Sequence, residues 1–303
     1  MNPAIDVVMA TYNGEDFLQA QLQSIAEQTL SPKRIIISDD ASSDDTLAII
    51  ERFSLQHPGL VETRRNYKNI GPVANFIKAL KFADPMHYVA LCDQDDLWTP
   101  ERLAKGAKLL ATITRDDKPC LVYSDLSVFN SKGAVSPSFW SEQGKGDYEH
   151  NFQTLLFGNL VTGCTTMMNP TARALLLDMP VDVDIHDAWL ALLAFGLGIA
   201  VGIREPLVQY RQHSANVTYQ EKEKKNKLVE KLQKHMHFFL HPETYLQSRL
   251  TTVQAFSDRH AQELDAEKRL AIEQFLMLKG KSYFSQKMAM RTAFRPYWLK
   301  AKN

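Results

Sequence analysis

Three short apolar runs, each followed at once by polar residues, constrain the fold of this chain more than any other feature. The runs are residues 5–10, 34–38 and 88–92, and helical patterns follow the first two after short polar turns. Apolar runs of this length that alternate with helices are typical of buried parallel strands. In an open parallel α/β sheet, ligands bind outside the carboxyl ends of the strands. We therefore expect the three polar clusters to meet at one edge of a sheet.

The cluster after the third run holds three carboxylates, Asp93, Asp95 and Asp96, within four residues. These groups repel one another unless a cation lies among them. Hard oxygen ligands suit Mg²⁺ or Mn²⁺, which keep open positions for substrate phosphates. A solvated loop or a helix N-terminus would explain an acidic tetrad equally well. The position of the cluster at a strand end favours the metal site.

Four motifs then follow one another in a fixed order along the chain. They are residues 10–13 (ATYN), residues 38–44 (SDDASSD), Asn69-Ile70-Gly71 with Asn75, and residues 93–96 (DQDD). In order and spacing they resemble the donor-site motifs of glycosyltransferase family 2, over roughly residues 4–217. The resemblance implies an α/β protein of the GT-A fold, with a Rossmann-like, mostly parallel sheet flanked by helices.

Later motifs resemble the bacterial rhamnosyltransferase branch of that family. They are Leu97-Trp98, Tyr123-Ser124-Asp125, Thr162-Gly163-Cys164, residues 186–190 (HDAWL), and residues 210–213 (YRQH) with Asn216. This resemblance implies transfer of L-rhamnose from dTDP-L-rhamnose to a growing O-antigen, capsule or similar bacterial surface glycan, with a lipid-linked saccharide as acceptor. Another donor, such as a UDP-hexose, remains an alternative.

Two alternatives belong to other classes of protein. A non-catalytic GT-A binding module would keep the fold but lose Asp95 or Asp187, and both are present. A nucleotidyltransferase usually has a glycine-rich N-terminal loop, where this chain has residues 11–14 (TYNG). Processive synthases of the superfamily carry a Gln-x-x-Arg-Trp motif, which is absent from the sequence, so we expect addition of a single sugar.

The resemblance also assigns the nucleotide site. The family holds the nucleoside with the residues after the first strand and the first acid of the second cluster, which here are Thr11, Tyr12, Asn13 and Asp39. Asp39 would contact the nucleobase, and Asp40 would brace the adjoining loop. Asn69 lies within reach of the nucleotide.

The metal and diphosphate residues come from both halves of the matched region. Asp95 would bind the metal as the last carboxylate of the Asp-x-Asp pattern, and Asp93 would face the ribose or the water shell of the metal. Related enzymes place a flexible loop over the diphosphate where this chain has residues 210–213. There Arg211 would neutralise phosphate charge, and His213 would either complete the metal shell or be a polar surface residue. The role of Asp96 is open between a helix cap and a contact to the acceptor or the sugar.

Asp187 would be the general base, because the family places its base at the opening of a helix in the second half of the domain. Aspartate at such a position is more often a helix cap in proteins generally. The family more often has Glu-Asp at these two positions, which leaves the role of His186 open. One base without a neighbouring nucleophile predicts inversion of the anomeric carbon.

Composition sets further bounds. The chain has 303 residues, 35 Lys+Arg against 35 Asp+Glu, and 45% hydrophobic residues, which suffices for a full core and gives no global attraction to nucleic acid. The three cysteines lie in apolar stretches without metal-ligand spacing, which favours reduced thiols in a cytoplasmic protein. We identify no signal peptide. The longest uncharged stretch, residues 188–203, is too short to span a bilayer and predicts a buried helix and a strand.

We expect two parts, a catalytic domain at 1–217 and a helical C-terminal region at 218–303. The donor-binding half would lie at about 1–98 and the acceptor half at about 99–217. Residues 279–303 contain seven Lys and Arg residues and no Asp or Glu, interleaved with aromatic residues and methionines. This composition suits peripheral binding to the anionic inner face of the cytoplasmic membrane. Docking of its apolar residues on the catalytic domain or on a second subunit is the alternative.

Overall fold

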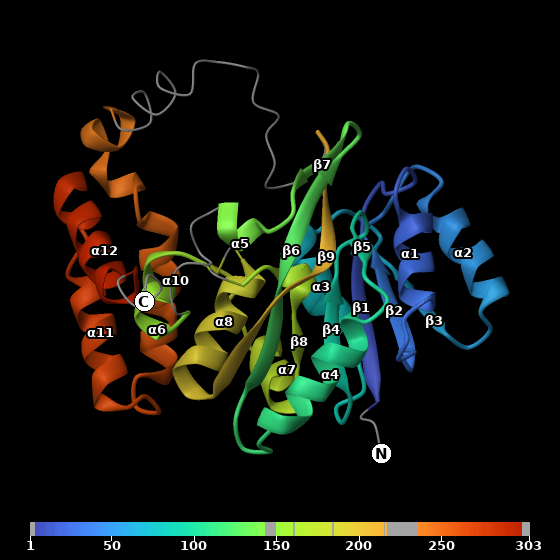
Figure 1. Cartoon of the computed structure of the whole chain (residues 1–303), viewed down its shortest axis with the longest axis horizontal. Helices are drawn as coiled ribbons and strands as arrows, with labels where there is room; N and C mark the ends of the chain where they lie inside the picture. Colours follow the sequence, from blue (N-terminus) through green and yellow to red (C-terminus); the bar gives the residue numbers. More distant parts are fainter. Residues whose placement is uncertain are drawn as a thin grey trace.

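The computed structural model describes residues 4–142, 150–159, 161–183, 185–214, 216 and 236–298, and side chains as far as Phe294 (Figure 1). The strands are β1 (Ile5–Thr11), β2 (Arg34–Asp39), β3 (Val61–Arg65), β4 (Tyr88–Cys92), β5 (Leu97–Trp98), β6 (Cys120–Asn130), β7 (Gly133–Ser136), β8 (Met167–Met168) and β9 (Ile199–Gln212). The α-helices are α1 (Leu18–Ala26), α2 (Thr46–Gln56), α3 (Pro72–Leu80), α4 (Arg102–Ile113), α5 (Phe139–Glu142), α6 (Phe152–Phe157), α7 (Pro170–Leu177), α8 (His186–Leu197), α10 (Gln247–His260), α11 (Ala266–Leu276) and α12 (Tyr283–Trp298). Two 3₁₀ turns, η1 (Gly163–Thr165) and η2 (Pro242–Thr244), complete the described elements.

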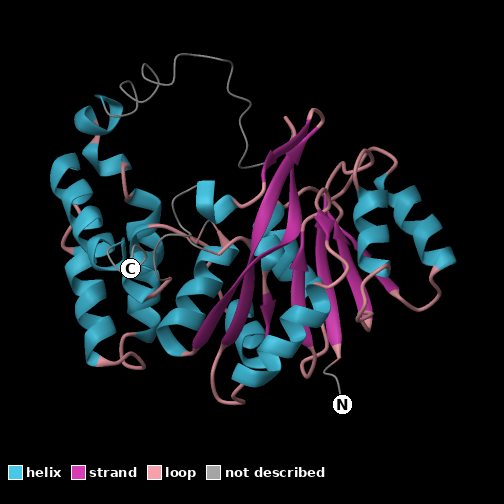
Figure 2. Cartoon of the chain, in the orientation of Figure 1, coloured by secondary structure: helices cyan, strands magenta, loops and turns pink. Residues whose placement is uncertain are grey.

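One mixed sheet organises the described part of the chain. Its strand order is β3-β2-β1-β4-β8-β6-β9-β5, with β7 paired to β6. The strands from β3 to β4 are parallel, β8 is antiparallel to both neighbours, and β9 runs parallel to β6. Helices flank the sheet, and α10, α11 and α12 lie at the opposite end of the molecule from α1 and α2 (Figure 2). The predicted α/β architecture with C-terminal helices is confirmed.

The parallel half forms for the reason that the apolar runs indicated. The interior positions of β1, β2 and β4 are buried on both faces, as in a sheet covered by helices. The register pairs Thr11 of β1 with Asp39 of β2, and Met9 of β1 with Cys92 of β4. The polar clusters that follow these strands therefore leave the sheet at one edge, as predicted.

The second half of the sheet corrects one expectation. We expected a strand that ends within residues 188–203 and a loop at 210–213, but residues 199–212 form the single strand β9. Its last residues pair with β6, with Arg211 opposite Phe129. Two register shifts beside Asp125 of β6 absorb the extra residues and keep the pairing intact. Of the four residues expected in the loop, His213 alone lies beyond the strand, and the pairing of β9 with β6 holds Arg211 in place.

The uncharged stretch forms α8 and the start of β9, as predicted. Most of α8 is buried, and its Trp189 packs edge-on against Phe256 of α10, with ring centroids 5.7 Å apart. Phe256 is fully buried and also contacts Phe152 of α6. The C-terminal helices therefore share a hydrophobic core with the second half of the sheet domain. All three cysteines are free and buried, as expected.

In the C-terminal tail, residues 279–303, some of the described apolar side chains are buried and others are exposed. Tyr283 is buried against Tyr245, and Phe294 packs on Phe157 of α6 at 6.5 Å between ring centroids. Phe284 and Met288 are 65% and 62% exposed. The boundary at 217/218, the charged stretch at 221–227, and the side chains of the last basic residues lie outside the described residues. Within the described residues, no helix combines the length and apolar character needed to cross a membrane.

Candidate active site

The ends of β1 and β2 form the floor of the site. The buried carboxylate of Asp39 accepts hydrogen bonds from Thr11 Oγ1 at 3.1 Å and from the Ser42 N–H at 3.0 Å, and also from the Ser42 hydroxyl. Thr11 is buried as well. The structure thus joins two of the residues predicted to surround the nucleoside, and it holds Asp39 rigidly through protein groups.

Asp40 ties a second loop to the end of β2. Its carboxylate accepts hydrogen bonds from the N–H groups of Ile70 and Gly71, both at 2.9 Å, and from Asn66 Nδ2 at 2.7 Å. Gly71 has a φ of 86°, which favours glycine. The expectation that Asp40 braces the loop is confirmed, and Asn69 lies exposed on that loop.

The turn after β1 is fastened to the loop after β2. Asn13 donates its N–H to Ser42 Oγ, and its Oδ1 accepts the Ser43 N–H, both at 2.9 Å. Asn13 and Ala41 both have positive φ, at 47° and 63°. Such backbone costs about 1–2 kcal/mol for a residue like alanine and concentrates at functional sites. Tyr12 is 47% exposed and leaves its ring free to meet a ligand.

Gln94 links the turn after β1 to the acidic loop, residues 93–96 between β4 and β5, a role that the sequence analysis missed. Its Oε1 accepts the Tyr12 N–H and its Nε2 donates to the Tyr12 carbonyl, both at 2.9 Å. A Cβ at Gly14 would lie 2.4 Å from Gln94 Oε1, so any larger residue would force the Gln94 side chain to move. The one uncharged residue in the acidic tetrad was the available signal.

Asp95 and His213, the two predicted metal ligands, lie in contact. His213 Nε2 is 2.8 Å from Asp95 Oδ2, and Asn216 Nδ2 donates to the same oxygen at 3.1 Å. The imidazole also packs on the ring of Phe17, with centroids 4.4 Å apart. The end of β4 and the residue after β9 thus deliver one carboxylate and one imidazole to a single point, 118 residues apart in the sequence.

Asp96 is neither a helix cap nor a surface residue, because it is fully buried and leads into β5. Its Oδ1 accepts the Arg211 N–H at 3.2 Å, and its Oδ2 has no hydrogen-bond partner among the described residues. Arg211 Nε donates to the Asp95 carbonyl at 2.9 Å. The guanidinium lies over the rings of Phe17 and Phe129, at 4.9 and 4.5 Å from their centroids. Arg211 therefore sits directly beside the acidic loop.

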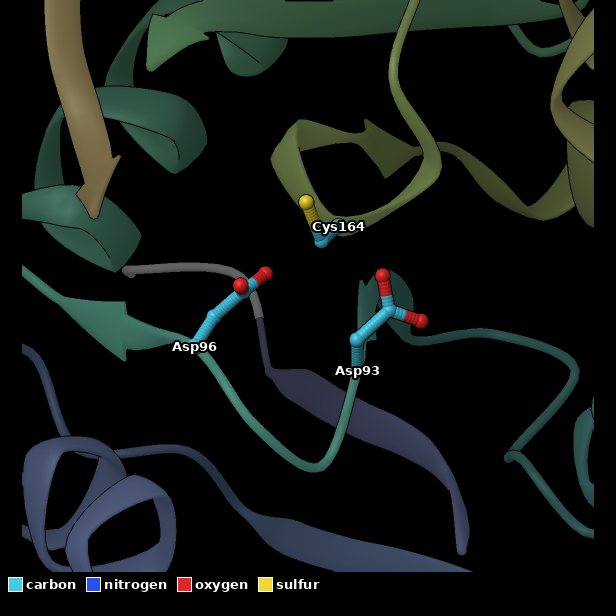
Figure 3. Close-up of side chains that lie close together, drawn as sticks. All are labelled: Asp93, Asp96 and Cys164. Atoms are coloured by element: carbon cyan, nitrogen blue, oxygen red, sulfur yellow. The ribbon is translucent and has the colours of Figure 1, made fainter. Parts of the chain in front are cut away.

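Cys164 completes a cluster with two of the carboxylates. Figure 3 shows Asp93 and Asp96 on one loop and Cys164 on another, facing a common space, with one potential ligand atom from each within 4.8 Å of the others. Burial and the charges of Asp95 and Asp187 raise the pKa of Asp93 to about 7. Burial and the charges of Asp93 and Asp95 raise the pKa of Asp96 well above its ordinary value. A bound cation would offset the burial and the mutual repulsion of the Asp93 and Asp96 carboxylates. Their oxygen atoms, with Asp96 Oδ2 unpartnered among the described residues, suit such an ion.

A buried positive charge lies behind this cluster. Arg102 Nη2 donates to the Cys164 carbonyl at 2.6 Å, and the guanidinium stacks 3.5 Å over the ring of Trp98. Burial lowers the pKa of Arg102 to about 10, which leaves it charged at neutral pH. This charge stabilises the anionic form of Asp96, and the guanidinium links the 163–165 turn to β4 by also donating to the Leu91 carbonyl.

Asp187 lies in the first turn of α8, where the sequence placed it. Its Oδ1 accepts from Asn159 Nδ2 at 2.7 Å and its Oδ2 from the Gly163 N–H at 3.1 Å. Burial raises the pKa of Asp187 to about 6. Because its charge also raises the pKa of Asp93, the two carboxyls belong to one site.

The neighbouring His186 is a neutral packing residue. Burial lowers the pKa of His186 to about 4, and its ring packs on Phe76 with centroids 4.7 Å apart. Neither ring nitrogen has a hydrogen-bond partner among the described residues.

Arg249 of α10 is a second residue that the sequence analysis missed. Its guanidinium donates to the carbonyls of Leu155 and Leu156 in the last turn of α6. The chain continues from there to Asn159, which holds Asp187. Burial lowers the pKa of Arg249 to about 10, and its charge lowers the pKa of Asp187. No local pattern signals this contact, because Arg249 lies far from its partners in sequence.

Several known proteins are similar to this chain in sequence. The model of the family described as "Glycosyl transferase family 2" matches residues 6–168. The chain is 28% identical over 243 residues to the dTDP-rhamnosyl transferase RfbG of Shigella flexneri, which covers 73% of this chain and 78% of RfbG. It is 26% identical over 216 residues to the UDP-Glc:alpha-D-GlcNAc-diphosphoundecaprenol beta-1,3-glucosyltransferase WfaP of Escherichia coli, over 71% of this chain and 79% of WfaP.

Solved structures share the fold. Residues 1–349 of S. aureus TarS in complex with UDP-GlcNAc match with a TM-score of 0.61 at 17% identity, over 98% of this chain and 79% of that 1–349 chain. The mannosyltransferase PcManGT from Pyrobaculum calidifontis, in complex with GDP-Man and Mn²⁺, matches with a TM-score of 0.54 at 18% identity, over 100% of this chain and 89% of PcManGT.

Proposed function

This chain belongs to glycosyltransferase family 2 and has the GT-A fold, and from that premise we propose that it transfers one L-rhamnose from dTDP-L-rhamnose to a growing bacterial surface glycan. The name of RfbG supports the donor, and the names of RfbG and WfaP support a bacterial glycan as the product. WfaP carries a UDP-sugar in its name, so a UDP-hexose is the alternative donor.

The contact between Asp95 and His213 carries the proposal. Two polar side chains at 2.8 Å, beside Asp93, form a donor set of carboxylate oxygens and an imidazole nitrogen that suits Mn²⁺ or Mg²⁺. The Mn²⁺ in the PcManGT complex supports this choice. When bound, the ion would act as a Lewis acid for the charge that develops on the leaving diphosphate. Arg211, held beside the acidic loop, would add a positive charge to the same group.

The turn after β1 and the loops after β2 and β3 would hold the nucleoside. Asp39 fixes Thr11 and the 42–43 turn, and the exposed ring of Tyr12 is available to stack on a base. Asn13 and Asn69 would border the pocket from its two loops. These roles follow from the position of each residue at the carboxyl edge of the sheet.

Asp187 would act as the general base. A pKa of about 6 leaves the carboxylate mostly ionised at neutral pH yet basic enough to take a proton. Asn159 donates to Oδ1 and the Gly163 N–H to Oδ2, and a carboxylate has about four lone-pair sites, which leaves room for an acceptor hydroxyl. The acceptor oxygen would bond to the anomeric carbon as the bond to the diphosphate breaks and Asp187 takes the hydroxyl proton. This single displacement inverts the anomeric centre.

The acceptor would be a lipid-linked saccharide, and the enzyme would be a cytoplasmic protein bound peripherally to the inner face of the membrane. The basic, acid-free segment 279–303 supports attachment to anionic lipids. We expect binding to phosphatidylglycerol liposomes at low salt and release at high salt. Failure to bind at low salt would make the tail a structural element alone.

A donor panel tests the function. We expect dTDP-L-rhamnose with Mn²⁺ or Mg²⁺ to raise the melting temperature more than UDP-glucose or UDP-GlcNAc, because a ligand at 100 times its Kd stabilises the native state by about 2.7 kcal/mol. Asp95→Asn should lose the metal-dependent increase and transfer, and the exposed control Asp117→Asn should keep both. Preference for a UDP-sugar would overturn the donor, and no response to any nucleotide sugar would overturn the function.

A further inference from the structure

An apolar cleft lies between α6, α11 and α12, outside the site described above. Its volume is about 770 Å³, within the range of pockets that hold small molecules. Phe157 of α6, Phe275 of α11 and Phe284 of α12 contribute apolar walls. Ala289 and Ala293, one turn apart on α12, leave room between the helices. The α11 and α12 helices lie next to each other at the end of the molecule in Figure 1.

The cleft lies close to the proposed general base. Phe157 lines the cleft, and Asn159, only two residues later, donates a hydrogen bond to Asp187 at 2.7 Å. Two residues of extended chain span at most about 7 Å. A ligand with its apolar end in the cleft could therefore present a polar end at Asp187 if a short polar linker joins the two.

The α12 side of the cleft favours an anionic linker. The stretch that forms α12 and the turn before it carries Lys279, Lys281, Lys287 and Arg291 and no acidic residue. The acidic residues Glu267 and Glu273 belong to α11, where Glu267 accepts a hydrogen bond from Gln153. Phe284 and Met288, which line the cleft, are 65% and 62% exposed, which is unusual for large apolar side chains that gather in one place. An apolar chain joined to phosphate matches both observations.

We propose that this cleft holds the hydrocarbon chain of the lipid-linked acceptor. The inference rests on the proposed function, because it uses Asp187 as the point where the acceptor sugar reacts. In such an acceptor the hydrocarbon would lie in the cleft and the sugar at Asp187, and the Lys and Arg residues of the α12 stretch would attract the phosphate that joins them. The concave, apolar shape suits a single hydrocarbon chain that leaves the bilayer. A protein surface that binds a flat membrane would instead be exposed and convex.

A vesicle experiment with a defined probe tests this site. Wild-type protein is bound to phosphatidylcholine vesicles that contain undecaprenyl phosphate, and to vesicles given the same charge with phosphatidylglycerol. We expect tighter binding to the first by on the order of tenfold, because the chain would cover part of the exposed apolar surface of the cleft. Met288→Glu should remove the preference, because it places a carboxylate in the cleft wall.

Met277→Glu is the matched control. Met277 is 68% exposed and lies near the end of α11, but it is not part of the cleft lining. The control should keep the preference for undecaprenyl phosphate. Equal binding of wild-type protein to both vesicles would overturn the proposal, as would equal loss in both variants. A change of oligomeric state in Met288→Glu with the preference intact would assign the cleft to a second copy of the chain.

The same variants separate this proposal from the function on which it rests. Met288→Glu should keep the thermal stabilisation by nucleotide sugar and the transfer to a water-soluble acceptor glycoside. If wild-type protein shows neither, the proposed function fails whatever the vesicles show. If both persist and the vesicle preference is absent, the cleft proposal alone fails.

Discussion

Asp187 combines the features that a general base requires, and its replacement is the most direct test of the chemistry. Asp187→Asn keeps the size of the side chain but removes the proton acceptor. We expect turnover to fall by a factor on the order of 100 or more, with the Kd of the donor unchanged. Asp182→Asn, at an exposed position just before the helix, should leave both quantities unchanged. A parallel loss of donor affinity in Asp187→Asn would move this residue into the donor site.

The pH dependence of turnover should report on Asn159. The base works in its ionised form, so turnover should fall as the pH drops below the pKa of about 6. Asn159 donates to the ionised carboxylate and therefore lowers its pKa. In Asn159→Ala the acidic limb of the kcat profile should move to higher pH by on the order of one unit, the value of one hydrogen bond to a charged group. An unshifted limb with lower turnover would assign Asn159 a purely structural role.

The contact between two loops depends on a glycine. Gly14→Ala would place a Cβ 2.4 Å from Gln94 Oε1 and push the side chain off the Tyr12 backbone. We expect a loss of about 1–3 kcal/mol in the free energy of unfolding and weaker donor binding, measured by urea denaturation and thermal shift. Gly158→Ala is the control, because nothing lies within 4 Å of its added Cβ. Unchanged donor affinity in Gly14→Ala would show that the nucleotide site does not depend on this contact.

The parallel half of the fold was predictable because its signals are local. Each apolar run ends in its own polar cluster, and the aligned ends of β1, β2 and β4 follow from parallel pairing. The extent of β9 was not predictable, since residues 210–212 are held by pairing with β6, about 80 residues earlier, and by two register shifts that no sequence pattern marks. The antiparallel insertion of β8, only two residues long, is set in the same way by its neighbours.

The candidate site shows the same division. The contact of Asp95 with His213 was anticipated from motif order, and the structure places the two side chains together. Gln94, Cys164 and Arg249 were missed because their partners are backbone groups or side chains brought in by distant loops. Gln94 stood out only as the one uncharged residue of the acidic tetrad, and residue type gave no reason to separate Cys164 and Arg249 from ordinary apolar or polar positions.

The division of the chain into residues 1–217 and 218–303 remains a proposal, and the core between α8 and α10 allows a test. Phe256→Ala removes a fully buried ring that packs on Trp189. We expect a loss of about 3–5 kcal/mol in the free energy of unfolding. We also expect a single unfolding transition, with the same shift whether it is followed by tryptophan fluorescence or by donor-induced stabilisation. Such coupling would indicate that the two parts unfold as one unit.

The matched variant for this test lies on the next helix. Leu270→Ala, at a position 53% exposed on α11, should change the free energy of unfolding by no more than about 0.5 kcal/mol. If Phe256→Ala instead produces a second, separate transition while the donor-stabilised one stays in place, the C-terminal helices form an independent unit.

Arg249 has a consequence for the order in which the enzyme becomes active during its synthesis. The residues assigned to the donor all precede α10, those for the nucleoside before residue 97 and Arg211 and His213 at or just after the end of β9, whereas the guanidinium that holds the end of α6 arrives with α10. Because N-terminal parts fold first as a chain emerges, we expect a nascent protein to bind its donor before Asp187 has its final surroundings. A ribosome-bound chain would then bind the nucleotide sugar without transferring the sugar, and transfer would begin only when the last helices dock.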